Sequence, residues 1–274
     1  TYIYVSALQD AGISAFRVEA NGTLTNVDNE NDGGLVRHVY EGGPFPRERG
    51  HITAFEHNAD YTYAAADITK GYSDKKAREV TRQFLYLRGE REFFVVFDRV
   101  EATRPDFARH FFLHVPTEPQ HRDGSLTWLS LPEADGDKNV LSNGRSRMFL
   151  HTLLPQRAEI VLRGGPGKEA WGHPLEPTAQ YNHMAERRLR PPVCPWRIEV
   201  ADTNDGPRSL FLHVFEITDE EVRQPADIVL VAPAGVDIAG RWRVRLYATG
   251  ELGGTVNDKP LATTVGIESQ YPSP

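Results

Sequence analysis

The pattern of apolar and polar positions is clearest between residues 80 and 114. In residues 80–87, successive side chains point to alternate faces of the predicted strand; both faces carry bulky side chains, and one also carries polar groups. Residues 93–97 (FFVVF) form a continuous apolar run. Such a run is typical of a strand that is covered on both sides. The polar segment 88–91 between them contains Gly89, which can take the positive φ that a hairpin turn often needs. The pattern predicts a hairpin with a buried second strand, followed by a third strand that ends near residue 114.

Similar short strands are predicted along most of the remaining chain. They comprise residues 51–55, 61–68, 125–131, 146–154, 159–163, 196–200, 209–216, 228–232 and 240–248, with a weak last one near 263–267. No stretch longer than about two turns has convincing helical periodicity. A dozen or so strands without a helical layer must bury their apolar faces against one another, and two packed antiparallel sheets do this most simply. We therefore predict an all-β fold, an antiparallel two-sheet β-sandwich (supersandwich-like) with long loops.

The predicted domain organisation has three parts. They are an N-terminal β-hairpin segment (1–30), a β-sandwich domain (31–250) and a C-terminal tail or edge strand (251–274). Two segments rich in Gly and Pro, 27–50 and 164–195, are predicted to be long loops, which makes them either functional or flexible.

Composition narrows the classes of function. The chain has 274 residues and a net charge of -7, which argues mildly against a nucleic-acid role and leaves an anionic polysaccharide only through a local basic cluster. No run approaches the roughly 20 apolar residues that span a bilayer. Cys194 is the only cysteine, so an internal disulfide and a cysteine-based structural zinc site are excluded. The first residues do not resemble a signal peptide, but a chain that begins with Thr gives little information about compartment.

Several short segments carry a family resemblance. They are NDGG (31–34), RERGHI (47–52), AFEH (54–57), YTY (61–63), ADIT (66–69) with Tyr72, VTRQF (80–84), VVFDRV (95–100), LH (113–114), TLLP (152–155), PWRIEV (195–200) and FLHV (211–214). In this order and spacing they resemble the heparinase II/III family of polysaccharide lyases, over most of the chain. The first 26 residues instead resemble one blade of a lactonase-type β-propeller, but nothing later repeats this blade, and a propeller needs about four or more.

The resemblance implies a lyase that cleaves uronic-acid-containing glycans by β-elimination. Members pair an N-terminal α/α toroid with a C-terminal β-sandwich, and this chain is similar to the sandwich alone. The family's catalytic tyrosine and partner histidine lie in or near the toroid. Its structural divalent metal lies in a His-rich segment before an Asp-Ser-Gly turn, and this chain has the blade-like hairpin instead. We therefore expect a module that is not catalytic alone, with no evident cofactor.

The same resemblance implies an acidic polysaccharide and an absent toroid domain as partners, and a secreted or periplasmic location. Two other interpretations stay open. One is an independent, non-catalytic carbohydrate-binding sandwich, and the other is a truncated structural or interaction module.

The residues themselves suggest two glycan-facing groups. β-Elimination needs a base, a group that neutralises the uronate carboxylate and an acid, and Tyr with a nearby His can supply these roles. Tyr181 and His183 lie together in the second long loop, where Trp171 and His173 could stack on sugars. Ordinary packing of loop residues over a sheet explains the same pattern.

The second group is Arg47, Arg49 and His51, which form a basic spot on an acidic protein. Arginine forks suit carboxylate and sulfate groups. Because Glu48 lies among them, a solvated loop or internal ion pairs would give the same sequence. The basic run at 187–190 could likewise contact an acidic partner or the absent domain, or be a solvated loop.

His51, Asp67 and His114 are candidates for a metal site, because imidazole and carboxylate suit zinc. Their long separations form no motif, and a hydrogen-bonded core histidine is the simpler interpretation for His114, as it is for His110 and His213. No metal ligands are therefore predicted.

Overall fold

The computed structural model describes residues 50–72, 74–122, 126–131, 146–168, 194 and 196–265, and the backbone of three short strands before them. These three strands, β1 (Tyr2–Ser6), β2 (Ile13–Val18) and β3 (Leu24–Asn26), form a small antiparallel sheet. In the described residues the only helical element is a 3-10 turn, η1 (Thr69–Gly71). This part of the chain has no helix that is long and apolar enough to cross a membrane. The all-β expectation is confirmed.

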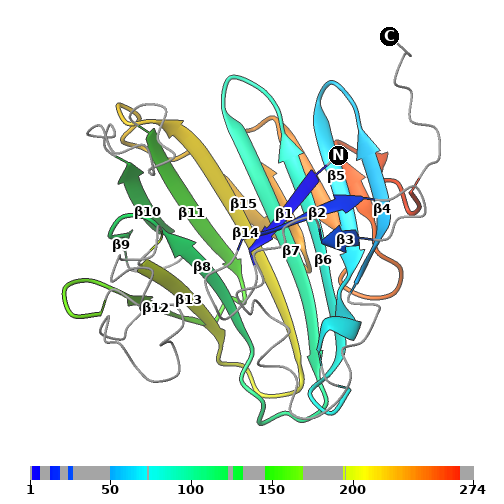
Figure 1. Cartoon of the computed structure of the whole chain (residues 1–274). Helices are drawn as coiled ribbons and strands as arrows, with labels where there is room; N and C mark the ends of the chain where they lie inside the picture. The colour runs from blue at the N-terminus through cyan, green and yellow to red at the C-terminus, as the bar shows by residue number, and fades with distance from the viewer. Residues whose placement is uncertain are drawn as a thin grey trace.

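The centre of the fold is an eight-stranded sheet in which every pairing is antiparallel (Figure 1). In spatial order its strands are β4 (His51–His57), β5 (Tyr61–Asp67), β6 (Ala77–Leu87), β7 (Glu92–Ala102), β14 (Arg208–Asp219), β11 (Ser146–Leu154), β10 (Leu126–Leu131) and β9 (Gln120–His121). β6 and β7 form the predicted hairpin, and their pairing begins at Leu87 and Phe93, directly beside the turn.

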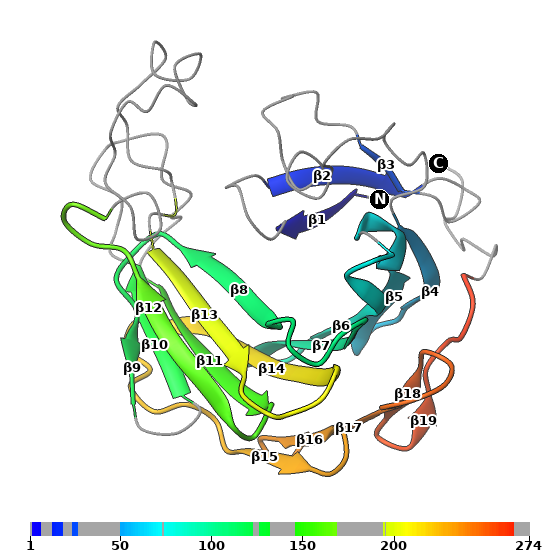
Figure 2. The same ribbon diagram turned by 90° about the horizontal axis from the view of Figure 1, so that it is seen from below.

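Two smaller antiparallel sheets cover opposite faces of this large sheet (Figure 2). One has the order β12-β13-β8, from β8 (His110–Val115), β12 (Ala158–Arg163) and β13 (Trp196–Asp202). The other contains β15 (Ile228–Val231), β16 (Gly235–Ile238), β17 (Trp242–Leu246), β18 (Gly254–Val256) and β19 (Lys259–Pro260), in chain order. We call the two sides of the large sheet the three-strand face and the five-strand face, after the sheet that covers each.

The continuous apolar run of β7 is explained by these three layers. Val95 and Phe97 belong to the core on the five-strand face, which also contains Val244 of β17. Val96 belongs to a second core on the three-strand face, together with Ile198 of β13. Because successive side chains of a strand point to opposite faces, a strand covered on both sides needs apolar residues at every position.

Two details differ from the simplest interpretation of the sequence. Gly89 does not have a positive φ; a Cβ at this position would lie 2.3 Å from Nη1 of Arg241, so the glycine allows a close approach. β18 and β19 fall within segment 251–274, and Val256 and Leu261 belong to the same core as Phe97. The three-part domain division itself stays a prediction.

Candidate functional site

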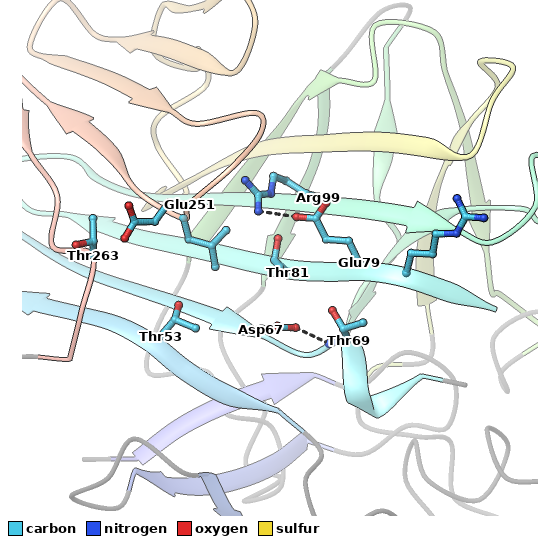
Figure 3. Close-up of a pocket in the computed structure, with 10 residues that line it drawn as sticks. Thr53, Asp67, Thr69, Glu79, Thr81, Arg99, Glu251 and Thr263 are labelled. Atoms are coloured by element: carbon cyan, nitrogen blue, oxygen red, sulfur yellow. Dashed lines mark hydrogen bonds and ion pairs between the residues drawn. The ribbon is translucent and has the colours of Figure 1, made fainter. Parts of the chain in front are cut away.

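A polar pocket of about 370 Å³ opens on the five-strand face of the large sheet (Figure 3). It lies between strands β4 to β7 and the segment that contains residues 251–263. Its lining consists mostly of hydroxyl and charged side chains: Thr53, Asp67, Thr69, Arg78, Glu79, Thr81, Arg99, Glu251, Leu252 and Thr263.

Strand register places the polar residues of the pocket in one row. Asp67 of β5 is opposite Thr81 of β6, and Thr81 is opposite Arg99 of β7. Directly opposite residues share a face, and so do residues two apart on one strand. Arg99 therefore continues the row of Val95 and Phe97, so the apolar face becomes polar at one end of the sheet.

Thr53 reaches the pocket through an irregularity in β4. Ile52 is opposite Ala66 and Ala54 is opposite Ala65, so Thr53 is an extra residue on its strand. An extra residue of this kind is a β-bulge, which bends the strand and redirects a side chain. The bulge adds a hydroxyl group to the pocket wall.

Arg99 is the buried charge of this site, with a side chain only 6% exposed. Its Nη2 lies 2.5 Å from Oε1 of Glu79, and its Nη1 donates to the carbonyl oxygen of Tyr247 at 3.3 Å. Across the pocket, Oδ1 of Asp67 accepts a hydrogen bond from the backbone N–H of Thr69 at 2.9 Å (Figure 3). Arg99, Glu79 and Asp67 are thus held in place by polar contacts.

Some polar atoms of the wall have no such contact. Nε of Arg99, Oγ1 of Thr81 and Oγ1 of Thr53 are buried and have no hydrogen-bond partner among the described residues. Buried polar groups are nearly always paired in folded proteins, so three unpaired atoms around one pocket indicate a place that can bind a polar ligand.

The three-strand face carries a second polar cluster directly behind the pocket. The guanidinium of Arg82 donates to both carboxylate oxygens of Asp98, from Nε at 2.7 Å and from Nη2 at 2.6 Å. The same guanidinium lies 5.7 Å from the ring centre of Phe111. This ion pair is bidentate, whereas Arg99 on the other face contacts its carboxylate partner through one nitrogen.

His213 belongs to the same buried cluster. Its Nδ1 lies 3.2 Å from Oγ1 of Thr152, and its ring centre lies 4.0 Å from that of Phe111. Burial, with a smaller contribution from the charge of Arg82, lowers the pKa of His213 to about 3. The imidazole therefore stays uncharged, as predicted for a core histidine.

Three tyrosines of the described chain have raised pKa values, which do not suit a catalytic base. Burial and then a hydrogen bond to Glu56 raise the pKa of Tyr61 to about 12. Burial also raises the pKa of Tyr63 and of Tyr72. A tyrosine that abstracts a proton must give up its own, so these raised pKa values oppose that role.

Only one of the predicted glycan-binding residues lies in the described part of the chain. His51 is exposed at the start of β4, opposite Asp67, and it does not line the pocket. The others, Arg47, Arg49, Trp171, His173, Tyr181 and His183, lie outside the described residues, as does the basic run at 187–190. Their roles stay predictions.

The candidate metal site at His51, Asp67 and His114 does not form. His51 and Asp67 are cross-strand partners, but His114 lies in β8 of a different sheet, opposite Arg197. Within the ranges that the structure describes, no three His, Cys, Asp or Glu side chains could hold a metal ion together.

Apart from Asp67, a candidate metal ligand, the residues of the pocket were not singled out from the sequence, although one signal was present. Asp98 and Arg99 place two adjacent charges inside an otherwise apolar strand. Such charges are almost never fully buried without partners, so the pair itself predicts a polar cluster on each face of that strand.

Comparison with known proteins gives a match at the level of structure. No family model and no curated protein sequence matches the chain. A mutant of the heparan sulfate lyase HepC from Pedobacter heparinus aligns with 94% of this chain at 12% identity and a TM-score of 0.41. A heparinase III with methylated lysines aligns with 70% at 10% identity and a TM-score of 0.42.

This chain spans 35% of the first of those proteins and 26% of the second. At TM-scores this low, the likeness assigns neither a family nor a role to any residue. The structure thus matches part of two heparin-type lyases over most of this chain, at low identity.

Proposed function

We propose that this chain is the β-sandwich module of a heparinase II/III-like polysaccharide lyase, which is not catalytic alone. Its role is to support an α/α toroid and to form one wall of a cleft for an acidic, uronic-acid-containing glycan. This proposal rests on the ordered sequence segments that resemble the family. It includes a secreted or periplasmic location, which follows from the same resemblance.

The observation that favours a supporting role is the state of the tyrosines and histidines. Burial raises the pKa of Tyr61, Tyr63 and Tyr72, and lowers that of His151 and His213. An elimination base must be accessible and have a pKa near the working pH. None of these five groups meets both conditions, whereas all of them fit the interior of a rigid scaffold.

The test is a cleavage assay with and without a toroid. The chain is incubated with heparin, heparan sulfate or alginate, alone and after fusion to the toroid encoded beside it in its source genome. Unsaturated uronide absorbance is followed over time. We expect no product from the chain alone and product from the fusion.

Three results would contradict parts of this proposal. Cleavage by the chain alone would overturn the non-catalytic role. Binding of the polymers without cleavage by either protein would favour an independent carbohydrate-binding sandwich. Neither binding nor cleavage, with aggregation of the isolated chain, would favour a truncated structural module.

A further inference from the structure

We propose that the pocket on the five-strand face binds an uncharged sugar ring and discriminates against its acidic counterpart. The described lining of this pocket contains none of the residues predicted to bind an acidic glycan, and the inference does not depend on whether the chain supports a toroid.

The first argument is the incomplete hydrogen bonding of the pocket wall. Thr81 and Arg99 are 6% and 5% exposed, yet Oγ1 of the first and Nε of the second have no partner within the described ranges. Oγ1 of Thr53, on the bulge of β4, is a third such atom. A guanidinium nitrogen only donates, whereas a hydroxyl group both donates and accepts. A polyhydroxyl ligand can satisfy such atoms once small side-chain rotations uncover them, because its own hydroxyl groups both donate and accept.

The second argument is charge. The wall contains three carboxylates, Asp67, Glu79 and Glu251, and two guanidiniums, Arg78 and Arg99. Each guanidinium already faces a carboxylate, Arg99 with Glu79 at 2.5 Å and Arg78 with Glu101 at 3.4 Å.

A uronate or sulfate would therefore meet a wall with a net negative charge, in which each guanidinium already contacts a carboxylate. Like charges brought together at an interface disfavour binding. The same carboxylates accept hydrogen bonds from neutral hydroxyl groups. Charge thus selects the neutral ligand.

The third argument is size and shape. A volume of about 370 Å³ is at the small end of the roughly 300–1,000 Å³ that is typical of ligand pockets. Tyr247 is 48% exposed and does not itself line the pocket. It lies near the lining residue Thr263, because a Cβ placed on Gly253 would be 3.5 Å from both Cε2 of Tyr247 and Cγ2 of Thr263. An exposed aromatic ring this close to a lining residue offers an apolar surface for the carbon face of a sugar.

The experiment compares matched sugars on the whole chain. Glucose, galactose, mannose and xylose are titrated by saturation-transfer NMR and calorimetry, beside glucuronic and galacturonic acid. We expect saturable binding of at least one neutral hexose. We expect its uronic acid, which differs only by the carboxylate, to bind at least about tenfold more weakly.

Variants then place the sugar in the pocket. Thr81→Val keeps the shape of the side chain and removes its hydroxyl group, so the affinity should fall from a few-fold to about tenfold. Thr53→Val should act in the same direction. Thr255→Val is the matched control, because Thr255 lies on β18 between the buried residues Gly254 and Val256 and is not in the pocket lining. It should leave the affinity unchanged.

Three results would overturn the inference. They are no saturable binding of any neutral sugar, equal or tighter binding of the uronic acid, and affinity that neither threonine variant lowers. Melting temperatures of the variants show that they are folded. The lyase assay of the fusion is read independently, so failure of sugar binding and failure of the proposed module function are distinguishable.

Discussion

Asp98 and Arg99 are neighbours in β7, yet their side chains lie on opposite faces of one sheet in different surroundings. On the three-strand face, both oxygens of Asp98 receive hydrogen bonds from Arg82, beside the ring of Phe111. On the five-strand face, Arg99 contacts Glu79 and a backbone carbonyl, and it belongs to the lining of the pocket.

The comparison distinguishes a charge held by a bidentate ion pair from one held by a single carboxylate contact and a backbone carbonyl. The bidentate pair uses both carboxylate oxygens of Asp98 and two of the N–H donors of Arg82. An ion pair with an unpaired nitrogen, beside unpaired hydroxyl groups, still has hydrogen bonds to make. The geometry of the ion pair, rather than the presence of charge, therefore distinguishes the two faces.

The largest expected effect comes from breaking the closed pair. Asp98→Asn leaves Arg82 without its counter-charge in a site where the carboxylate is 9% exposed. We expect the free energy of unfolding, measured by urea titration, to fall by about 3–5 kcal/mol. Asp106→Asn is the control, since Asp106 pairs with Arg104 on the surface and its replacement should change little. Equal losses in both variants would show that the pair at Asp98 is not a structural element.

Breaking the open pair should have a smaller effect. Arg99→Met removes the contact to Glu79, whose side chain is 24% exposed and can regain solvent. We expect a loss of about 1–3 kcal/mol in the same urea titration. Arg78→Met, at a side chain 62% exposed, should change stability by no more than about 0.5 kcal/mol. A loss at Arg99 larger than that at Asp98 would reverse the contrast between the faces.

The pH dependence of stability tests whether a histidine on each face of the large sheet, His213 and His151, is shielded from water. Burial lowers the pKa of His213 to about 3 and that of His151 to about 4, from 6.5. His213 lies on the three-strand face; His151 is opposite Val214 and so lies on the five-strand face. Between the folded and unfolded pKa values, the unfolded chain binds more protons.

Stability is therefore fully present above about pH 6.5 and falls as the pH drops toward 4, by roughly 1 kcal/mol per pH unit for each histidine. The measurement is urea unfolding at pH 7, 6, 5 and 4. His213→Gln and His151→Gln should each make this slope shallower. An unchanged slope in either variant would show that its histidine is hydrated.

The smallest expected effect compares two threonines on opposite faces. Thr81→Val removes a buried hydroxyl group that has no partner in the described part of the chain, so stability should stay equal or rise by up to about 1 kcal/mol. Thr152→Val removes a hydrogen bond to His213 and should cost about 1 kcal/mol. Thermal unfolding of both variants measures the sign of each change. A clear loss at Thr81 would mean that its hydroxyl group is satisfied in the folded protein.

Much of the fold follows from local sequence. The apolar run at residues 93–97 correctly indicated a strand covered on both faces, and the hairpin before it is present. β16 was missed because Gly235 and Asp237 interrupt its apolar pattern, although the strand packs Val236 into the core. Local periodicity therefore finds long buried strands better than short ones that contain Gly or Asp.

The candidate site was less accessible to sequence reasoning, for a physical reason. The pocket depends on the register that places Asp67, Thr81 and Arg99 opposite one another, and on a bulge at Thr53. Register and bulges are set by pairing between distant segments, which local patterns do not encode. The loops that carried most predicted binding residues lie outside the described chain, so their contribution stays a prediction.

The two-sided burial of β7 has a consequence for tolerance to substitution. In β17, buried Trp242, Val244 and Leu246 alternate with more accessible positions, so a systematic scan of replacements should show tolerance at every second residue. In β7, residues 93 and 95–99 are all buried. That stretch should appear as an unbroken block of intolerant positions, in which natural variation is confined to exchanges of similar volume. Drift of the sequence should therefore be slowest along this strand.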